Sequence, residues 1–595
     1  MPIKNGLKTS WPDLKNVFIL ACFIGIAFLP CLGAQFVYWD DDLHLLNNPL
    51  VYTTDFGSIA SIFQTVINKT YIPLTILSFN LEYCLFGLSP FVYHLDNLIL
   101  HILVCILVYA LVRRMGFEAM IALLAALLFG IHPMHVESVA WVTQRKDVLY
   151  ALFYVLSIYH YWNHLTRNNR WSYTLSLAFG FLSILAKPMA LSLPLVLLLL
   201  DWYHKGPLTQ RSFVNKIPFL IAIVPIAWLT YTLNARTPTV NGWESFLIWS
   251  WTATFYIKKF FTPFVLLPLY QLPQPINLWN ASYASSILIM AGLLTGMFWF
   301  RKNRLFLFGC WFYILSTFFI WRYDNTVDVT IVGDRFMYLP SLGICLWLAA
   351  VLGEKLKNKH SEKRFVVRAL VIVVLFLAVK TSSQCRVWKD DISLWDYVLG
   401  HGQPIALAYN SRGAAFSKLG EQGRALEDIN KALQLKPNYA LAYYNRGKIH
   451  AGLNDNGRAL EDFTASLKIN PKHEKSFLER GIIKSKENQL PQALDDFNNA
   501  LKLDPKDAAV YNNRGIVYKK MGQWEQALAD YSRALAFNPR SGQAYVNRSS
   551  VWKELKRYNE AKNDIQKAQE LGFPVDSTSL RLPRLRQVAG RGGTK

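Results

Sequence analysis

Residues 92–112 read VYHLDNLILHILVCILVYALV and are followed at once by Arg113 and Arg114. A mostly apolar run of about 20 residues matches the hydrocarbon thickness of a bilayer, and cations directly after it favour a cytoplasmic end. The stretch therefore predicts a membrane-spanning helix that ends in the cytoplasm. Similar runs recur between about residues 15 and 383, which predicts a helical membrane domain over residues 1–383.

The composition agrees with a membrane protein that carries a soluble part. Of the 595 residues, 52% are hydrophobic and 17% are charged, against roughly 25% charged residues in soluble domains. A single core rarely exceeds about 250–300 residues, so we expect at least two domains. The chain has 7 cysteines and none after Cys385, which excludes a secreted disulfide scaffold.

The positions of Lys and Arg predict the topology. Lys4, Lys8 and Lys15 precede the first apolar run, so the N-terminus is predicted to be cytoplasmic and the run to be an anchor. Residues 246–268 carry Lys258 and Lys259 in their middle and are interpreted as a re-entrant or interfacial segment. The remaining runs alternate between basic clusters and give about 11 spans with the C-terminus outside. These predicted spans are approximately residues 17–34, 92–112, 118–133, 147–164, 171–187, 189–203, 217–233, 284–300, 305–321, 336–353 and 364–382.

The net charge of +23 is shared between the two parts of the chain. After residue 400 there are 32 basic and 20 acidic residues, so both parts have a basic surplus. The basic clusters of the membrane part are short and coincide with predicted cytoplasmic loops. No nucleic-acid site is needed to explain the charge, and nucleic acid is not an expected partner.

The C-terminal part repeats every 34 residues. Small residues at fixed positions allow two antiparallel helices to approach closely, and a proline ends the second helix of each unit. Period, small residues and proline match the tetratricopeptide repeat, and five copies predict an α-solenoid over residues 406–575. Residues 384–405 are expected to form a linker, and the basic tail 576–595 to be disordered. The repeated pairs are Arg412-Gly413, Arg446-Gly447, Arg480-Gly481, Arg514-Gly515 and Arg548-Ser549.

One repeat position on the first helix carries Asn445, Asn513 and Asn547. Asparagine at this position resembles the asparagine ladder of the nucleocytoplasmic O-GlcNAc transferase, whose amides hold a peptide backbone. We therefore expect an acceptor protein or peptide on the concave face of the array. The alternative interpretation is a solvated polar helix face.

Three adjacent carboxylates, Asp40, Asp41 and Asp42, follow the first span in the sequence FVYWDDD, within an external loop predicted over residues 35–91. Adjacent carboxylates raise one another's pKa values, which suits a general base, and a pair of them also suits a divalent cation. A solvated acidic turn is the alternative. The other external loops favour a site.

Cations and histidines gather in those other external loops. The second loop, GIHPMHVESVAWVTQRKD, contains His132, His135, Glu137 and Arg145. No tetrahedral ligand set for zinc is evident there. The next two loops add cations and supporting groups between apolar runs. Carboxylates with Arg, Lys and His on one side of the membrane indicate a base and a phosphate clamp. The residues of these further loops are Lys187, Asp334, Arg335 and Tyr338.

The chain resembles the transmembrane and tetratricopeptide-repeat-containing (TMTC-type) glycosyltransferases of the GT-C class. The resemblance rests on FVYWDD, YIPLTILSFNLEYCLFGLSPFVYHLDNLILH, HPMHVESVAWVTQRKDVL, LAKPMALSLPLVLLLLDW, GDRFMYLPSLG and the repeats. The family is similar to protein O-mannosyltransferases, which transfer a sugar from a polyprenyl-phosphate donor to Ser or Thr on the non-cytoplasmic face. GT-C enzymes carry the catalytic acid in the first external loop, which corresponds to Asp40 or Asp41.

The sequence departs from the animal members in two ways. Ile72 precedes Pro73 where those members are expected to have Arg, and five repeats are few. The resemblance is therefore to a bacterial relative, with undecaprenyl phosphate as donor lipid and the inner membrane as location. A eukaryotic protein would lie in the ER membrane.

The resemblance implies an inverting transfer in which Asp41 or Asp40 deprotonates the acceptor hydroxyl. The leaving lipid phosphate is expected to bind Arg145, Lys187 and Arg335, with His132 and His135 as hydrogen-bond partners. Asp42, Glu137, Asp334 and Tyr338 are expected to support these groups.

No cofactor beyond the lipid-linked sugar is expected; adjacent aspartates allow a divalent metal, but the similarity to protein O-mannosyltransferases disfavours one. Two alternatives are a non-catalytic membrane-anchored repeat scaffold and a lipid-linked-sugar transporter, and the scarcity of charges deep in the spans disfavours the transporter.

Overall fold

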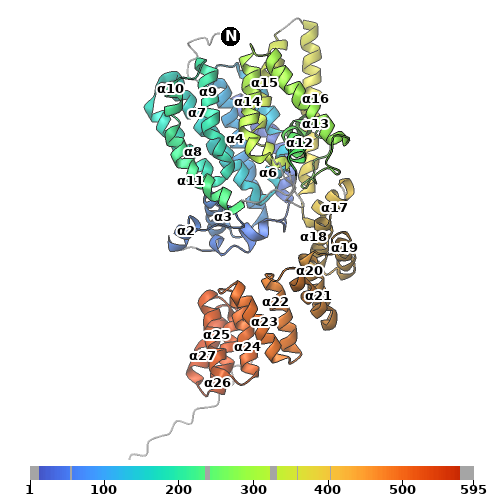
Figure 1. The fold of residues 1–595 in the computed structure, drawn as a ribbon. Helices are drawn as coiled ribbons and strands as arrows, with labels where there is room; N and C mark the ends of the chain where they lie inside the picture. Colours follow the sequence, from blue (N-terminus) through green and yellow to red (C-terminus); the bar gives the residue numbers. More distant parts are fainter. Residues whose placement is uncertain are drawn as a thin grey trace, which may run out of the picture. The chain divides into compact units, whose positions relative to one another are not determined.

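The computed structural model describes residues 13–53, 56–234, 241–321, 332–357, 360–402 and 404–575. The chain divides into two compact units, Met1–Gln403 and Pro404–Lys595, and helices make up both of them (Figure 1). Within the described residues no strand forms, and the only β-type pairs are two isolated bridges. The predicted all-α class with C-terminal repeats is confirmed.

The first unit consists of membrane-type helices joined by short 3-10 turns. Its α-helices are α1 (Leu14–Phe28), α2 (Phe56–Ile62), α3 (Pro73–Phe86), α4 (Pro90–Arg114), α5 (Ala119–Gly130), α6 (Val136–Ala140), α7 (Arg145–Arg167), α8 (Arg170–Ala186), α9 (Leu193–Lys205), α10 (Gln210–Val214), α11 (Ile217–Asn234), α12 (Gly242–Phe261), α13 (Ala281–Trp299), α14 (Arg304–Thr317), α15 (Ser341–Lys355), α16 (His360–Val387) and α17 (Asp391–His401). Residues 384–405, predicted as a linker, thus contain the end of α16 and the whole of α17.

Small residues allow a close contact between two helices of this unit. α14 packs against α15, which also packs against α5. A Cβ atom added to Gly309 or to Gly343 would lie 2.9 Å from the carbonyl oxygen of the other glycine. Because a side chain at either position would push the two backbones apart, glycine is required at this crossing, as is common between membrane helices.

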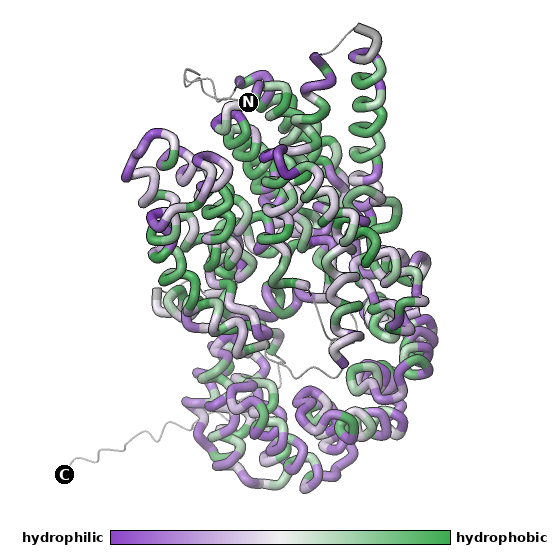
Figure 2. Tube along the Cα trace, turned by 45° about the horizontal axis from the view of Figure 1, so that its top comes forward, coloured by the Kyte–Doolittle hydropathy of each residue, from purple (hydrophilic) through white to green (hydrophobic). Residues whose placement is uncertain are grey.

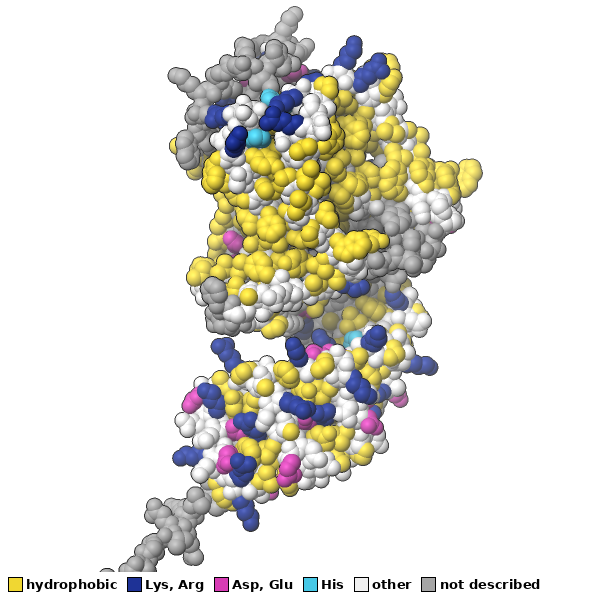
Figure 3. Space-filling model, turned by 60° about the vertical axis from the view of Figure 1, so that its left-hand side comes forward, with side chains coloured by type: hydrophobic (Ala, Val, Ile, Leu, Met, Phe, Trp, Pro, Cys, Tyr) yellow, Lys and Arg dark blue, Asp and Glu magenta, His cyan; other side chains and the backbone are white. Residues whose placement is uncertain are grey.

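Among the described residues, four helices are long and apolar enough to cross a membrane: Leu14–Gly33, Pro90–Arg114, Ala281–Trp299 and Lys363–Val387. The pair Ala119–Gly130 and Pro133–Ala140, bent by 53°, adds a fifth if it is one span. Figure 2 shows long hydrophobic stretches along helices of the first unit, and Figure 3 shows a broad hydrophobic surface on this unit with Lys and Arg side chains near one end.

The count of about 11 spans is not confirmed. Several other predicted spans form helices of fewer than 18 residues, such as α9 with 13 residues and α15 with 15. A 3-10 turn at Pro188–Ser192 separates α8 from α9. α12 covers most of the segment interpreted as re-entrant. Lys4, Lys8, residues 322–331 of the last external loop and the tail 576–595 lie outside the described residues.

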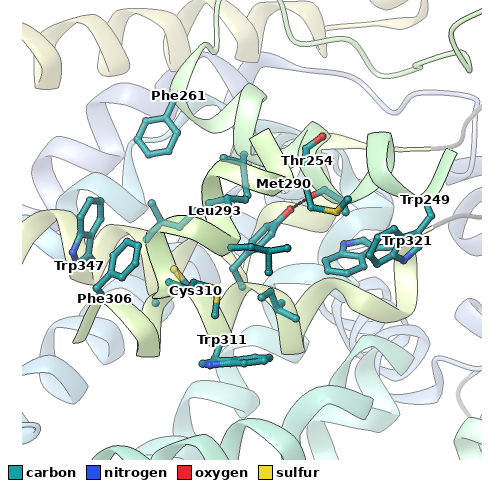
Figure 4. Close-up of a pocket in the computed structure, with 18 residues that line it drawn as sticks. Trp249, Thr254, Phe261, Met290, Leu293, Phe306, Cys310, Trp311, Trp321 and Trp347 are labelled. Atoms are coloured by element: carbon teal, nitrogen blue, oxygen red, sulfur yellow. Dashed lines mark hydrogen bonds between the residues drawn. The ribbon is translucent and has the colours of Figure 1, made fainter. Parts of the chain in front are cut away.

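An apolar cavity of about 400 Å³ lies between α12, α13, α14 and α15 (Figure 4). Aromatic, aliphatic and sulfur-containing side chains make up most of its wall. Its lining includes Trp249, Met290, Cys310, Trp311 and Trp347. The cavity is therefore suited to a hydrocarbon chain.

The second unit is a row of five helix pairs. Their helices are α18 (Ala406–Lys418), α19 (Gln422–Leu435), α20 (Ala440–Gly452), α21 (Asn456–Ile469), α22 (Glu474–Lys486), α23 (Leu490–Leu503), α24 (Ala508–Lys520), α25 (Trp524–Phe537), α26 (Gly542–Glu554) and α27 (Tyr558–Glu570). Glycine is needed where the two helices of a pair meet: a Cβ at Gly447 would lie 2.8 Å from the ring of Phe463.

The repeated arginine joins neighbouring pairs. Each one binds the aspartate 16 residues later, on the second helix of its own pair, through two guanidinium nitrogens. From the second repeat onward, its third nitrogen donates to a polar side chain on the second helix of the preceding pair, for example from Arg446 to Asn430 at 2.7 Å. Bidentate contacts of this kind fix geometry as well as contributing energy. The pairs are Arg412–Asp428, Arg446–Asp462, Arg480–Asp496, Arg514–Asp530 and Arg548–Asp564.

Candidate active site

Stacked tryptophans hold the acidic segment, residues 36–42, in place. Trp39 stacks on Trp141 with 4.7 Å between ring centroids, and Trp141 stacks on Trp388 at 5.1 Å. Trp39 also contacts Trp395 at 5.3 Å. Aromatic pairs at these separations stabilise beyond the area that they bury. The stack therefore fixes the aspartates against the second external loop and against the segment that had been predicted as a linker.

Asp41 is buried, and both of its carboxylate oxygens accept hydrogen bonds. Its Oδ2 accepts from the backbone N–H of Val37 at 2.9 Å. Its Oδ1 accepts from the backbone N–H and the hydroxyl of Thr143 at 3.0 and 2.6 Å. Burial raises the pKa of Asp41 to about 6, although these hydrogen bonds favour the ionised form. Asp41 therefore ties the acidic segment to the start of the Thr143 turn.

Asp40 differs from its neighbour in being half-buried. Its carboxylate makes no hydrogen bond to any residue that the structure describes, whereas its backbone carbonyl accepts from the backbone N–H of His44. Asp40 is an electrostatic partner of Lys146 and of Arg335. Of the two aspartates proposed as base from the sequence, Asp40 is thus the one whose oxygens are available to a substrate.

The raised pKa of Asp41 predicts a contribution to stability that depends on pH. In the unfolded chain Asp41 ionises near its ordinary pKa of about 4, whereas the folded protein keeps its proton up to about pH 6. Between these values the folded state binds more protons than the unfolded state. The contribution of Asp41 to the free energy of unfolding therefore falls by about 3 kcal/mol as the pH rises from about 4 to about 6.

Thermal unfolding of wild type and of the Asp41→Asn variant between pH 4 and pH 8 measures this contribution. We expect the Tm of the variant to rise relative to that of the wild type as the pH increases to about 6, and the difference between them to stay constant above that pH. Glu118→Gln, at an exposed carboxylate paired with Lys357, is the control and should show no such trend. A difference between wild type and Asp41→Asn that does not change with pH would contradict the prediction.

Three cations from three separate elements form one electrostatic group: Lys146 and Arg335 interact with Asp40, and Lys187 interacts with Lys146 and Arg335. Lys187, at the end of α8, forms an ion pair with Asp147. Arg335 forms an ion pair with Glu137 and also donates its backbone N–H to that carboxylate at 2.9 Å. The Lys187 and Arg335 head groups lie 5.2 and 4.9 Å from the ring centroid of Phe336, so both lie against one side chain.

Lys146 is the third cation. It is 9% exposed and forms no hydrogen bond or ion pair with any described residue. Its electrostatic partners include Asp40, Arg335 and Asp147. Because a nearly buried ammonium without a bonded partner is costly, Lys146 is the cation of this group that is most available to an anionic ligand.

Arg145, although adjacent to Lys146 in sequence, belongs to a different network. It is fully buried, and each of its guanidinium nitrogens has a protein acceptor. Nε donates to Asn97 Oδ1 at 2.8 Å, Nη2 donates to the carbonyl of Tyr93 at 3.0 Å, and Nη1 pairs with Glu82. Arg145 therefore joins α7 to α3 and α4, and the structure does not bring it to the cation group.

The two histidines of the second loop are held by protein groups. His132 Nδ1 accepts from the backbone N–H of Met134 at 3.2 Å, so its Nε2 carries the proton and donates to the carbonyl of Phe260 at 3.0 Å. His135 Nε2 lies 3.0 Å from the hydroxyl of Ser341, while its Nδ1 has no hydrogen-bond partner among the described residues. Both side chains are buried.

The remaining predicted supporting residues lie in buried hydrogen-bond networks. The hydroxyl of Tyr338 lies 2.6 Å from His101 Nδ1. Asp334 accepts from the hydroxyl of Tyr270 at 3.1 Å through both oxygens. Asp42 begins a one-turn π-helix, Asp42–Leu46. In the part of the chain that the structure describes, no three His, Cys, Asp or Glu side chains form a group suited to a metal ion.

The predicted asparagines bond within the repeat array. Asn445 donates to Asn410 at 3.0 Å, and Asn547 donates to Asn512 at 2.9 Å, each between first helices of neighbouring repeats. Asn513 donates to the carbonyl of Ala509 in its own helix. These contacts place the asparagine side chains on the surface formed by the first helices.

Sequence reasoning noted Lys146 and Asp147 in the charged second loop but assigned them no role in the site, and it did not single out Thr143. Residues adjacent on a helix point about 100° apart, so only one of Arg145 and Lys146 can face Asp40. The only available signal was the density of charged residues in TQRKD, and this density does not show which way each side chain points from the helix.

Comparisons with known proteins follow this division of the chain. Residues 73–232 match the family model described as dolichyl-phosphate-mannose-protein mannosyltransferase. Tetratricopeptide-repeat models match five segments of the second unit, namely residues 413–454, 440–473, 481–522, 508–541 and 542–571. The N-terminal match covers α3 to α11, which includes Lys146, Lys187 and the second external loop.

Several similar proteins are named protein O-mannosyl-transferases. One from Caenorhabditis elegans is 27% identical over 72% of this chain and 63% of its own length. Human TMTC3 is 24% identical over 72% of this chain and 52% of its own length. Human TMTC1 is 25% identical over 69% of this chain and 54% of its own length. The chain thus spans about half to two thirds of the length of these relatives.

Solved structures that match cover less than a third of the chain. The crystal structure of MamA is 21% identical over 27% of this chain and 94% of its own, with a TM-score of 0.26. That of YrrB, described as a TPR protein with an unusual peptide-binding site, is 21% identical over 30% and 91%, also with a TM-score of 0.26.

The chain joins a mannosyltransferase-type membrane region to tetratricopeptide repeats. The resemblance to TMTC-type protein O-mannosyl-transferases is confirmed by these matches.

Proposed function

We propose that the protein is a membrane glycosyltransferase that moves a sugar from a polyprenyl-phosphate donor to a Ser or Thr hydroxyl of a protein. The observation that carries this proposal is the group formed by Asp40, Lys146, Lys187 and Arg335. The half-buried carboxylate of Asp40 makes no hydrogen bond to a described residue and interacts electrostatically with Lys146 and Arg335, and Lys187 interacts with both of these cations. Such a group provides a base and a binding site for a phosphate leaving group.

In the proposed reaction, Asp40 accepts the proton of the acceptor hydroxyl as its oxygen attacks the anomeric carbon. The new C–O bond forms while the bond between that carbon and the lipid phosphate breaks, and the electron pair leaves on the phosphate. One displacement inverts the anomeric centre. Lys146, Lys187 and Arg335 bind the phosphate that is released, so positioning and electrostatics supply most of the acceleration.

Other residues of the site hold these groups in position. Asp41 orients the acidic segment through Thr143, Glu137 orients Arg335, and Asp147 orients Lys187. Arg145, whose acceptors are all protein groups, is proposed as a positioning residue rather than a phosphate ligand, and His132 and His135 are likewise assigned to positioning. No metal ion takes part in the proposed step.

The apolar cavity between α12 and α15 is proposed to hold the hydrocarbon chain of the donor. α15 begins six residues after Arg335 and lines the cavity through Ile344 and Trp347. A lipid phosphate bound at Arg335 would therefore lie a few residues along the chain from the helix that lines the apolar cavity. Membrane lipid is the expected surrounding of α13, most of whose surface is not buried in the protein.

For topology we propose about 11 spans with a cytoplasmic N-terminus and the repeat unit on the non-cytoplasmic face. The site then faces the same side as the repeats, which are proposed to bind the acceptor protein. The bacterial inner membrane is the proposed location.

The test is a transfer assay with the full chain in lipid nanodiscs, undecaprenyl-phosphate [³H]mannose and Ser/Thr-containing peptides. We expect Lys146→Gln to raise the donor KM about 10- to 100-fold, because a hydrogen bond to a charged group contributes about 1.5–3 kcal/mol. Lys357→Gln, an exposed lysine paired with Glu118, is the matched control and should leave the KM unchanged. Absence of transfer from any polyprenyl-phosphate hexose would leave the scaffold alternative.

A further inference from the structure

The first helices of the repeat unit form a surface that carries several lysines without a carboxylate partner among the described residues. This first-helix face is defined by side chains that contact one another across α18, α20, α22, α24 and α26. Lys519 donates to the hydroxyl of Ser550 at 2.7 Å, and Lys520 donates to the carbonyl of Ser485 at 2.5 Å. These contacts join neighbouring first helices, as do the asparagine pairs described above.

Two further lysines lie on the same face. Glu479 on α22 interacts electrostatically with Lys448 on α20 and with Lys486 on its own helix. Lys448, Lys486 and Lys520 are exposed, and Lys519 is half-buried. None of the four forms an ion pair within 4 Å with a described carboxylate. Glu479 and Glu474, both on α22, interact with Tyr444 of α20, so two acids stand against four lysines and this part of the face is net positive.

The other cations of the repeat unit do not give a comparable surface. The repeated arginines are neutralised by their aspartates. On the second helix α19, Lys431 is paired with Glu427 and Arg424 with the nearby Glu421. Lys468 on α21 and Lys502 on α23 are exposed too, but α21 and α23 carry net charges of 0 and −1, whereas the first helices α20, α22 and α24 carry +2, +2 and +3. The positive surplus therefore lies on the first helices of the second, third and fourth repeats.

We propose that the first-helix face binds an extended, acidic segment of a partner protein. The lysines supply charge and the asparagine amides supply donors and acceptors for a peptide backbone. Neighbouring helices lie about 8–10 Å apart and an extended chain advances about 3.3 Å per residue, so one repeat matches about three residues. An acidic side chain every few residues then meets a lysine from successive repeats.

A protein segment fits this face better than a nucleic acid does. Single-stranded nucleic acids are usually bound by aromatic side chains that stack on successive bases. The contacts that define the face are made by Lys, Asn, Ser and Glu side chains and by one backbone carbonyl. The partner is therefore assigned by charge and backbone hydrogen bonding.

This inference rests on the proposed role of the repeats in binding an acceptor protein, and its test is a direct binding measurement. The probe is a fluorescein-labelled (Glu-Ser)₆ peptide, titrated with the full chain in nanodiscs and followed by fluorescence anisotropy. The comparison probes are (Gln-Ser)₆ and a dT12 oligonucleotide. We expect the Glu peptide to bind at least tenfold more tightly than either, and its affinity to fall at high salt.

The variant Lys486→Gln/Lys519→Gln/Lys520→Gln should weaken binding of the Glu peptide at least tenfold. The matched control Lys431→Gln/Lys468→Gln/Lys502→Gln removes three exposed lysines from the second helices α19, α21 and α23 and should change it less than twofold. Circular dichroism melting checks that both variants fold.

Equal binding of the Gln peptide, tighter binding of dT12, no binding at all, or an equal loss in the control variant would each overturn the inference. If the Glu peptide fails to bind while sugar transfer that depends on Asp40 persists, the inference falls and the proposed function stands. If sugar transfer fails while the Glu peptide binds in a charge-dependent way, the proposed function falls and the inference stands.

Discussion

The Asp40→Asn variant is expected to lose at least a hundredfold in kcat for sugar transfer while it folds as the wild type does. Asparagine has nearly the same shape but accepts no proton, and a positioned general base contributes about 10²- to 10⁴-fold. The Asp40 carboxylate is half-buried and makes no hydrogen bond to a described residue. Its replacement therefore removes little packing, and we expect Tm to change by about 2 °C or less.

Two variants make this result specific. Glu118→Gln, which alters an exposed carboxylate in a surface pair, should keep the wild-type kcat. Asp41→Asn should lower both activity and Tm, because it weakens the hydrogen bonds that hold the acidic segment to Thr143. Wild-type kcat in Asp40→Asn, with a large loss in Asp41→Asn at unchanged Tm, would reverse the assignment of the base.

The second large effect is expected at Arg145. Replacing it by Met leaves the carboxylate of Glu82, which is 7% exposed, without its cation. Removing one partner of a buried ion pair typically costs about 3–5 kcal/mol, since the other charge remains buried. The hydrogen bonds to Asn97 and to the carbonyl of Tyr93 are lost as well. We therefore expect a clear fall in the Tm of the detergent-solubilised protein.

The double variant Glu82→Gln/Arg145→Met should recover part of this loss, because it also removes the stranded charge. Arg167→Met, at an exposed arginine that ends α7, is the control and should stay within about 0.5 kcal/mol of wild type. A variant Arg145→Met with wild-type Tm and a raised donor KM would instead support the phosphate-binding role inferred from the sequence.

The fold could largely be predicted, because its determinants are local and periodic. Apolar runs, the 34-residue period and the Gly and Pro positions are properties of neighbouring residues, and they correctly gave an all-helical protein with C-terminal repeats. The number of spans did not follow in the same way. Some predicted spans form helices shorter than a bilayer crossing needs, such as α9 with 13 residues and α15 with 15, and apolar composition does not show how long each helix is.

The segment 384–405 illustrates a second difference. It was predicted to be a linker, but Trp388 stacks on Trp141, and Trp395, which lies within α17, contacts Trp39. Their partners are more than 200 residues away in the chain. No local pattern contains that information.

The sequence by itself predicted that this protein combines helical apolar segments with tetratricopeptide repeats, and it showed which loops between the apolar runs carry ionisable residues. Only the tertiary structure distinguished the members of adjacent pairs: Asp40 is available and Asp41 is engaged, while Lys146 interacts electrostatically with Asp40 and Arg145 is paired with Glu82. The physical reason is that one residue along a turn or helix rotates a side chain by about 100°. Neighbours with the same charge therefore enter different surroundings, and those surroundings are built from residues far away in the chain.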